Sequence, residues 1–296
     1  MCPGIGNMSH KKRHHILPQR YQKGFADLSG RVWYYDRRRG HIACENPLNV
    51  AVETNFYTSE STDSPNPAFM EDFLAEHIES PFWPVLETLE KRQIPSSEDR
   101  QRVSVFAAFL LTRVVAFRDA LTKILGDVML TSNNLAATME TVPGLFEMSK
   151  DGLFIPKMPK NHALNQMGRL GIEATKILLT LNNHFMYSPA NEPFITSDNP
   201  FVFDKMVNID EPPSVGAHSY LKWVPLSARV AVGFGLPGNN IFMSEMNVTQ
   251  VKQANLRFAT AARQIIIATT KHQLEEVLSI IPKNPPGSAT AFPSAI

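Results

Sequence analysis

The sequence contains very little cysteine, since only Cys2 and Cys44 occur among its 296 residues. Two thiols cannot form a disulfide framework or a multi-cysteine zinc site, so we expect a reducing, cytoplasmic location. Long apolar runs are also missing, because the longest, at 105–111, is soon interrupted by Thr112 and Arg113. A bilayer crossing needs roughly 20 apolar residues, and a secretory signal needs an apolar N-terminal core. We therefore expect neither a membrane span nor a signal peptide.

Familiar catalytic motifs are missing as well. The sequence has no GxxxxGKS/T phosphate loop, no HExxH zinc helix and no GxSxG nucleophile elbow. These absences disfavour P-loop nucleotide hydrolysis and α/β-hydrolase chemistry. Rossmann redox chemistry is disfavoured because the order of the expected elements is not that of a wound parallel sheet.

The sequence also lacks a strong net charge. The formal charge is +1 and the isoelectric point is near 7.8, so the overall field does not attract nucleic acid or an anionic membrane. Polyanion contact is left to two short basic runs, residues 11–13 and 37–39. A solvated tail or turn is the alternative interpretation of each run.

The composition is that of a folded chain, with 43% hydrophobic and 19% charged residues. No long Gly/Ser or Pro-rich linker divides it, so we expect one globular domain over residues 11–280. A flexible leader at 1–10 and a Pro/Ser-rich tail at 281–296 flank this domain.

The pattern of elements favours an α+β fold, in which a helical middle (about 68–182) packs with an N-terminal β-hairpin and a C-terminal antiparallel sheet. The stretches RVWYYD and NVAVETNFYTS, with the turn RRRG between them, predict a short β-hairpin or two edge strands within 30–57. Apolar spacing predicts a helix over 68–80, which Pro81 and Pro84 end or kink. A long helix begins at the Ser96–Asp99 start signal and runs to about Leu125. Further elements are expected as helices near 129–141, 162–182, 246–263 and 272–279, with short aromatic and β-branched strands from 184 onward.

Adjacent histidines in the stretch KKRHHILPQRYQKGF are the first candidate for chemistry. In an extended segment His14 and His15 point to opposite sides, so only one of them can face a given site. Imidazole binds several transition metals and transfers protons near neutral pH. The alternative is one exposed ring and one buried ring bonded to backbone.

An acidic helix and a buried arginine are the second candidate. Asp72, Glu76 and Glu79 share a helical face, where they could bind a metal, remain solvated or pair with an arginine. Arg113 lies in the apolar stretch FLLTRVVAF, where a fixed charge is costly unless it is paired. It could form a structural ion pair or bind an anion.

The stretch FITSDNP, residues 194–200, is a strand that enters a turn. Asp198 at a strand end suits a metal ligand or a catalytic acid. Short polar side chains there also form Asx-turns, which is the alternative.

Five stretches in order resemble the family catalogued as domain of unknown function 4238: HHILPQRYQKGF, VWYYD, VAVETNFYT, FITSDNP and VPLS. The resemblance spans roughly residues 10–270. Gln22 departs from it, because the family usually has an apolar residue there. It leaves open whether Glu71 or Asp72 is the matching acid of the helix.

The resemblance implies a shared polar site, although the family's label names no activity. We expect Pro18, Tyr21 and Phe25 to anchor the histidine segment so that it faces Asp198, Asn199 and Arg113. The expected roles are catalysis by His14, His15, Asp198 and Arg113; substrate binding by Gln19, Tyr21, Asn199, Lys12 and Arg13; and metal binding by His15, Asp72, Glu76, Glu79 and Asp198.

Two functions remain open from the sequence. The first is a metal-assisted, nuclease-like hydrolase acting on a phosphodiester or another anionic substrate, with nucleic acid or a phosphorylated small molecule as its partner and a divalent metal as its cofactor. The second is a non-catalytic binding or regulatory module whose His/Arg/Asp network is structural. The oligomeric state stays open.

Overall fold

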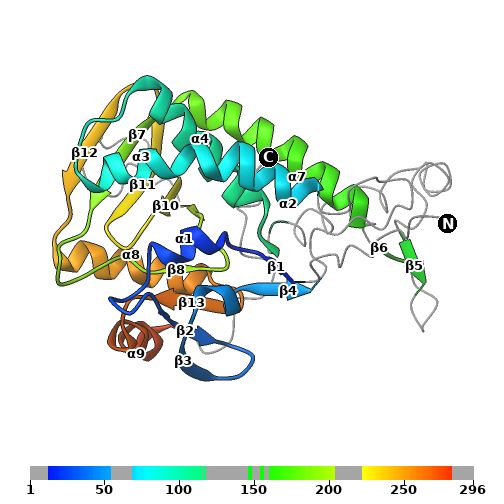
Figure 1. Cartoon of the computed structure of the whole chain (residues 1–296), viewed down its shortest axis with the longest axis horizontal. Coiled ribbons are helices and arrows are strands. Elements are labelled where there is room, and N and C mark those ends of the chain that lie inside the picture. The colour runs from blue at the N-terminus through cyan, green and yellow to red at the C-terminus, as the bar shows by residue number, and fades with distance from the viewer. Residues whose placement is uncertain are drawn as a thin grey trace, which may run out of the picture.

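The fold combines helices with two main sheets, which confirms the α+β class (Figure 1). The computed structural model describes residues 13–54, 69–115, 117, 146–148, 154–156, 160–203 and 222–281. The helix expected at 129–141 lies outside these residues, as do the expected leader and tail, apart from Ile281 at the start of the tail.

A four-stranded antiparallel sheet joins the two ends of the described chain. Its strand order is β3-β2-β13-β8. The predicted hairpin supplies two of these strands, and two strands from the last third of the chain complete the sheet. The bounds are β2 (Val32–Asp36), β3 (His41–Glu45), β8 (Thr196–Ser197) and β13 (Ile265–Ala268). An N-terminal hairpin is therefore confirmed, but its second strand is β3 and not the stretch from Asn49 onward, which pairs with another strand. The hairpin also belongs to the same sheet as C-terminal strands.

A five-stranded sheet forms the other layer, in the order β12-β7-β11-β10-β9. Its strands are β7 (Leu181–Tyr187), β9 (Val202–Phe203), β10 (Lys222–Pro225), β11 (Val230–Pro237) and β12 (Ile241–Glu245). All neighbours pair antiparallel except β12, which runs parallel to β7. The antiparallel prediction therefore holds for every pair but that one. The turn after β11 crosses the start of β7 at Gly238, whose φ of +153° suits glycine.

The helical middle begins with one continuous helical run, α2 (Phe69–Phe73), the π-helix η2 (Leu74–Glu79) and α3 (Ser80–Glu90). Of the two outcomes expected for Pro81 and Pro84, ending the helix or kinking it, the first does not occur, because both lie within α3, which continues to Glu90. A proline in the first turn of α3 needs no helical N–H partner, and the chain absorbs the irregularity in the π-helical turn before it.

The predicted start of the long helix is confirmed by a capping box in which Ser96 and Asp99 bond each other's backbone amides. This helix is α4 (Ser97–Thr112), with Arg113 as its C-cap, and residues 118–125 of the expected extension lie outside the described part. The next long helix, α7, covers Lys160–Leu179 and ends earlier than expected because its last predicted residues begin β7.

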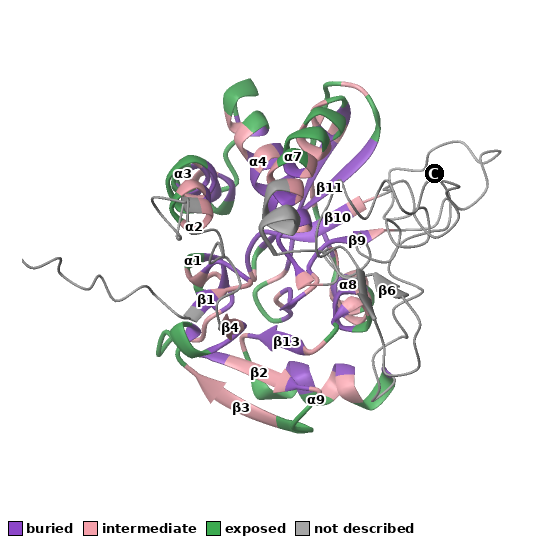
Figure 2. Ribbon diagram, turned by 90° about the vertical axis from the view of Figure 1, so that its right-hand side faces the viewer, coloured by how far each residue is buried: buried purple, intermediate pink, exposed green. Residues whose placement is uncertain are grey.

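Figure 2 shows how these layers meet: α4 and α7 cover one side of the five-stranded sheet, and α8 lies between the two sheets. The helix α8 (Val248–Ala261) begins with a capping box at Asn247 and packs Phe258 against Trp223, with 5.4 Å between ring centroids. The last helix, α9 (Lys271–Ile280), lies on the four-stranded sheet. Among the residues described, no helix is both long and apolar enough to cross a membrane. The remaining elements are α1 (Gln19–Lys23), the 3-10 helix η1 (Pro47–Asn49) and two strand pairs, β1 (Arg13–His15) with β4 (Val52–Thr54) and β5 (Phe146–Met148) with β6 (Phe154–Pro156).

Candidate functional site

The histidine pair lies on β1 (Arg13–His15), which pairs antiparallel with β4 (Val52–Thr54). The strand geometry sends the two rings to opposite sides, as expected. His14 is 1% exposed, whereas His15 is half-buried. Behind them, Tyr21 and Phe25 are fully buried, as the anchoring hypothesis requires.

His14 faces the acidic helix. Its Nε2 lies 3.7 Å from Oε2 of Glu71, whose side chain is 22% exposed. When the imidazole is protonated, this contact is an ion pair that joins β1 to α2. The structure thus selects Glu71 over Asp72 as the acid that approaches the histidines.

Arg113, at the end of α4, contacts both the acidic helix and the strand β1. Its Nη1 lies 2.6 Å from Oε1 of Glu79, and its Nη2 donates to the backbone oxygen of His15 at 3.2 Å. The Arg113 side chain is 6% exposed and the Glu79 side chain 16%. The arginine is therefore paired with the acidic helix, one of the two roles left open by the sequence.

His15 carries an unsatisfied nitrogen. Its Nε2 is buried and has no hydrogen-bond partner among the described residues. Burial lowers the pKa of His15 below 6.5, although a backbone hydrogen bond at Leu48 and the Glu71 carboxylate act in the opposite direction. The positive charge of Arg113 adds to the lowering. At neutral pH the ring is consequently neutral, with a nitrogen lone pair able to accept a proton.

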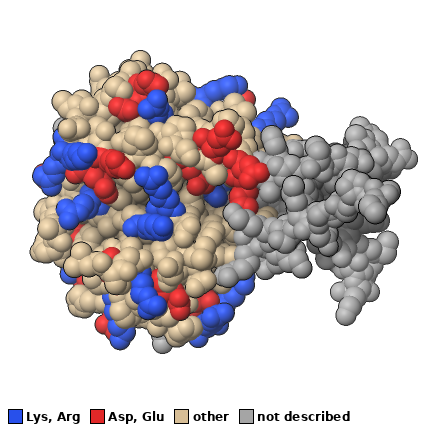
Figure 3. All heavy atoms as spheres, viewed as in Figure 1, with Lys and Arg blue, Asp and Glu red and all other residues tan. Residues whose placement is uncertain are grey.

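The acidic helix carries its π-helical turn at this point. Glu79 ends η2, and Ser80 Oγ donates to the backbone oxygen of Ala75 at 2.8 Å. Asp72 and Glu76 are exposed on the same run of helix. Figure 3 shows acidic side chains gathered on the face over α2 and η2. Single π-helical turns occur often at functional sites.

The predicted metal ligands do not form a metal site in the described part of the chain. There, no three His, Cys, Asp or Glu side chains are arranged to hold a metal ion. Glu79 pairs with Arg113, Asp198 is bound elsewhere, and Asp72 and Glu76 face solvent. The expected set of His15, Asp72, Glu76, Glu79 and Asp198 is therefore not supported by the geometry.

Asp198 and Asn199 have structural contacts. The two carboxylate oxygens of Asp198 accept from the backbone amides of Arg263 at 2.9 Å and Gln264 at 2.8 Å. Burial raises the pKa of Asp198 to about 6, against the lowering effect of these amides. Asn199 Nδ2 donates to the oxygen of Ala261 at 3.1 Å. The TSDNP turn thus holds the connection from α8 to β13. These bonds of Asp198 reach across the fold and are not those of the Asx-turn alternative; the local bond within the turn runs from the Asn199 amide to Ser197 Oγ, at 3.3 Å.

The predicted substrate-binding residues are divided. Tyr21 has a structural role, because its hydroxyl shares a 2.7 Å hydrogen bond with Thr196 Oγ1 and donates to the backbone oxygen of Pro225 at 2.7 Å. Gln19 begins α1 and is half-buried. Lys12 lies outside the described residues, and Arg13 is described only as the start of β1.

A comparison with family models decides the relationship. The model of the family described as "Protein of unknown function (DUF4238)" matches residues 13–272. The chain belongs to the DUF4238 family. No curated protein and no solved structure matches it. The DUF4238 region runs from β1 into the start of α9, and it includes the whole cluster of His14, His15, Glu71, Glu79 and Arg113, which we call the histidine–arginine cluster.

Gln22 is the residue at which the resemblance led us to expect an apolar side chain. Its side chain is fully buried, and Nε2 donates to the backbone oxygens of Leu17 at 3.0 Å and Val50 at 3.2 Å. Its Oε1 is buried without a partner among the described residues. An apolar residue at this position would face the same core without a buried amide group to satisfy.

Sequence reasoning missed a second buried cation. Arg100 is 7% exposed, and its Nε donates to Asn183 Oδ1 at 2.9 Å. Its Nη2 donates to the backbone oxygens of Leu179 at 2.8 Å and Leu181 at 2.9 Å. Leu179 is the last residue of α7, so Arg100 caps that helix. Its place near the N-terminus of α4, beside exposed Glu98 and half-buried Asp99, gave no signal of burial.

Proposed function

We propose that the histidine–arginine cluster is the functional site of a hydrolase and that His15 is its general base. The carrying observation is the Nε2 of His15, which is buried, unpartnered among the described residues and held on a ring whose pKa is lowered. A neutral imidazole of this kind can take a proton from an attacking water molecule.

The free-energy cost of burying the ionisable groups of the cluster supports a functional role. Burying charged pairs is seldom better for stability than burying apolar residues of the same volume. Here two histidines, two glutamates and an arginine gather around one short strand pair, next to a π-helical turn. Perturbed ionisable groups in such clusters are frequent at functional sites.

Each residue has a place in this proposal. His15 accepts the proton. His14 lies on the opposite side of β1, where it contacts Glu71, and it is not a base in this proposal. Arg113 holds the backbone of His15 through its oxygen, so it is a positioning residue. Asp198 has no catalytic role in the proposal, because both of its oxygens already accept backbone amides.

The charge of the cluster bears on the substrate. Glu71 and Glu79, with the exposed Asp72 and Glu76 on the same helix, outnumber Arg113. A phosphodiester would be repelled unless a divalent cation came with it, because Mg²⁺ commonly binds through one or two carboxylates together with substrate phosphate oxygens. We therefore keep the substrate class as phosphodiester or another anion, with the reaction dependent on an added divalent cation. The low cysteine content supports a reducing, cytoplasmic setting for it.

The test is hydrolysis of bis(p-nitrophenyl) phosphate and of labelled single-stranded nucleic acid, with and without Mg²⁺ or Mn²⁺. We expect His15→Asn to lower the rate by roughly 10²–10⁴-fold, as for loss of a general base. His41→Asn removes an exposed imidazole on β3 and is the matched control. In the wild type the acidic limb of the rate should lie below pH 6.5, because the pKa of His15 is lowered. Equal rates in wild type and His15→Asn, or no hydrolysis of either substrate, would contradict the proposal.

A binding module is the second candidate. Arg113 and Asp198 are both buried and bonded within the protein, which is the arrangement of a structural network. For this function we expect no hydrolysis in any condition, while substitution of His14 or Arg113 lowers the melting temperature by several degrees. Unchanged melting in both variants would contradict the structural network.

A further inference from the structure

The strand β3 has an open edge. It is the terminal strand of its sheet, and in the described part of the chain β2 is the only strand that pairs with it. Figure 2 shows β3 as the outermost strand, away from the helices of the other layer. Its residues are exposed or half-buried. An edge of this kind presents unpaired backbone groups that can accept another strand.

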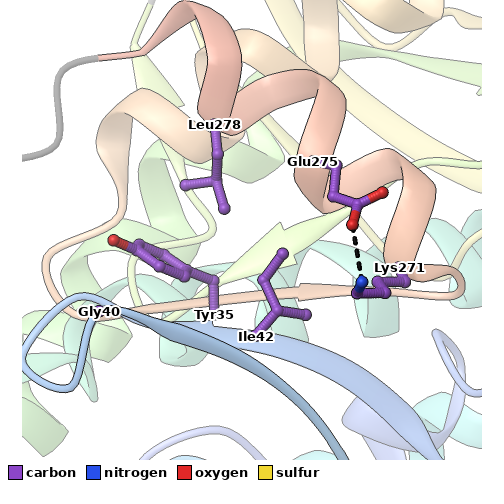
Figure 4. Close-up of a pocket in the computed structure, with 6 residues that line it drawn as sticks. All are labelled: Tyr35, Gly40, Ile42, Lys271, Glu275 and Leu278. Carbon is purple, nitrogen blue, oxygen red and sulfur yellow. Dashed lines mark ion pairs between the residues drawn. The ribbon is translucent and has the colours of Figure 1, made fainter.

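A groove lies between this hairpin and α9 (Figure 4). Its volume is about 450 Å³, and Tyr35 and Ile42 rise from the sheet toward Leu278 of the helix. An ion pair of 2.8 Å between Lys271 and Glu275 lies at one side. Ile42 and, two residues later, Cys44 point to this side of the sheet, so the open edge carries an apolar stripe on its groove face.

Charge changes sign along the hairpin. At the turn, Asp36 and the three arginines 37–39 give a net charge of +2. At the other end, Asp27, Arg31 and Glu45 lie close enough to act on the Cys44 thiol, and they give a net charge of −1. The basic run that the sequence singled out is therefore one pole of an edge strand whose other pole is acidic.

We propose that this edge binds a second copy of the chain, with β3 paired antiparallel to the partner's β3 about a two-fold axis at Ala43. In this register His41, next to Arg39, lies opposite the partner's Glu45, and Glu45 lies opposite the partner's His41. A parallel pairing would instead bring like ends together, which is unfavourable for charges that face each other directly. A two-fold interface needs a self-complementary surface, and the sequence HIACE provides one.

The side chains fit this arrangement. Ala43 is small and lies at the axis, so the two backbones can approach closely. On the groove face, Ile42 lies opposite the partner's Cys44, which extends the apolar stripe across the two copies. The pairing would make one continuous sheet from the two four-stranded sheets. Five residues a side form a small contact, so the dimer is of the weak, transient class.

The experiment measures self-association by sedimentation velocity of the full chain, from about 10 μM to about 500 μM, a range suited to a weak interface. Glu45→Lys places like charges at both ends of the paired strands, and we expect it to weaken the dimer roughly tenfold. The double variant His41→Glu with Glu45→Lys reverses both poles and should restore association. Glu90→Lys makes the same charge change on the exposed end of α3 and is the matched control.

Restoration by the double variant, with Glu90→Lys unchanged, is the expected result. A protein that stays monomeric over the whole range overturns the proposal. So does a dimer that Glu45→Lys leaves intact, because the edge is then not the interface. Failure of the double variant to restore a weakened dimer overturns the antiparallel register. Equal melting temperatures of the variants, whose substituted side chains are exposed or half-buried, exclude a folding defect.

Discussion

Substitution of Arg113 by methionine removes the contact that holds the acidic helix, the end of α4 and β1 together. In the wild type the guanidinium binds Oε1 of Glu79 at 2.6 Å and the backbone oxygen of His15 at 3.2 Å. Methionine keeps much of the side-chain length but leaves the Glu79 carboxylate and this carbonyl without that donor.

The magnitude follows from burial. Breaking a buried ion pair by removing one partner costs about 3–5 kcal/mol. Because the Glu79 side chain is 16% exposed and can gain hydration, we expect the lower end, about 3 kcal/mol. For a chain of this size each kcal/mol lowers the melting temperature by about 2 °C, so the fall should be about 6 °C. Adding Glu79→Met removes the stranded charge and should recover all but about 1 kcal/mol, which belongs to the His15 carbonyl.

The assay is thermal melting followed by circular dichroism at pH 7, with urea unfolding to obtain the free energies. Arg102→Met is the control, because Arg102 pairs with Glu98 at the same 2.6 Å but with side chains 38% and 71% exposed. An exposed pair contributes about 1 kcal/mol or less, so this variant should melt within about 2 °C of wild type. The reasoning is refuted if Arg113→Met behaves like this control, or if the double variant loses the sum of the two single losses.

Two further predictions test the surroundings of the cluster. Gln22→Leu should leave the melting temperature unchanged or raise it, because leucine removes the buried Oε1, which has no partner among the described residues. A fall of several degrees would mean that the two hydrogen bonds of Nε2 stabilise the protein by more than the unpartnered Oε1 destabilises it. For Asp198, the folded pKa of about 6 lies above its ordinary 3.8, so the folded state holds the proton more tightly and stability falls as pH rises from about 4 to about 6. The free energies of unfolding of the wild type and of Asp198→Asn are measured by urea unfolding across this pH range. As pH rises, the wild type should lose up to about 3 kcal/mol relative to the variant. A flat or opposite trend would show that the two amides keep the carboxylate ionised.

Local signals in the sequence predicted much of the fold. The Ser96–Asp99 start of α4 and the strand β2 with the RRRG turn after it depend on neighbours a few residues apart, so their patterns can be recognised in the sequence. The strand β3 was not predicted, because the second strand of the hairpin was placed later in the chain. The pairing of the hairpin with β13 was not predictable, because it joins residues more than 200 positions apart. The parallel strand β12 was missed because its five residues are only partly buried and show no clear pattern.

The site was predictable in its residue types but not in its partners. The cost of burying Arg113 in an apolar stretch indicated that it needs an acid, and the acidic helix was one of the named alternatives. Which acids turn inward depended on the π-helical turn, which shifts the face of the helix. Glu71 approaches His14 and Glu79 approaches Arg113, while Asp72 and Glu76 stay exposed. Asp198 looked like a ligand because a strand end is a common place for one, but two backbone amides more than 60 residues away bind it instead.

The sequence alone indicated where α4, α7, α8 and α9 lie, that the fold is α+β, that His14 and His15 face opposite ways, and that the chain resembles the family to which it belongs. These follow from periodicity, caps and motifs, which act over short distances along the chain. The tertiary structure decided which charges pair, which histidine nitrogen lacks a partner, and which strand edge stays open. These depend on burial and on contacts between distant segments, and burial sets both the cost of an unpaired polar group and the direction of each pKa shift.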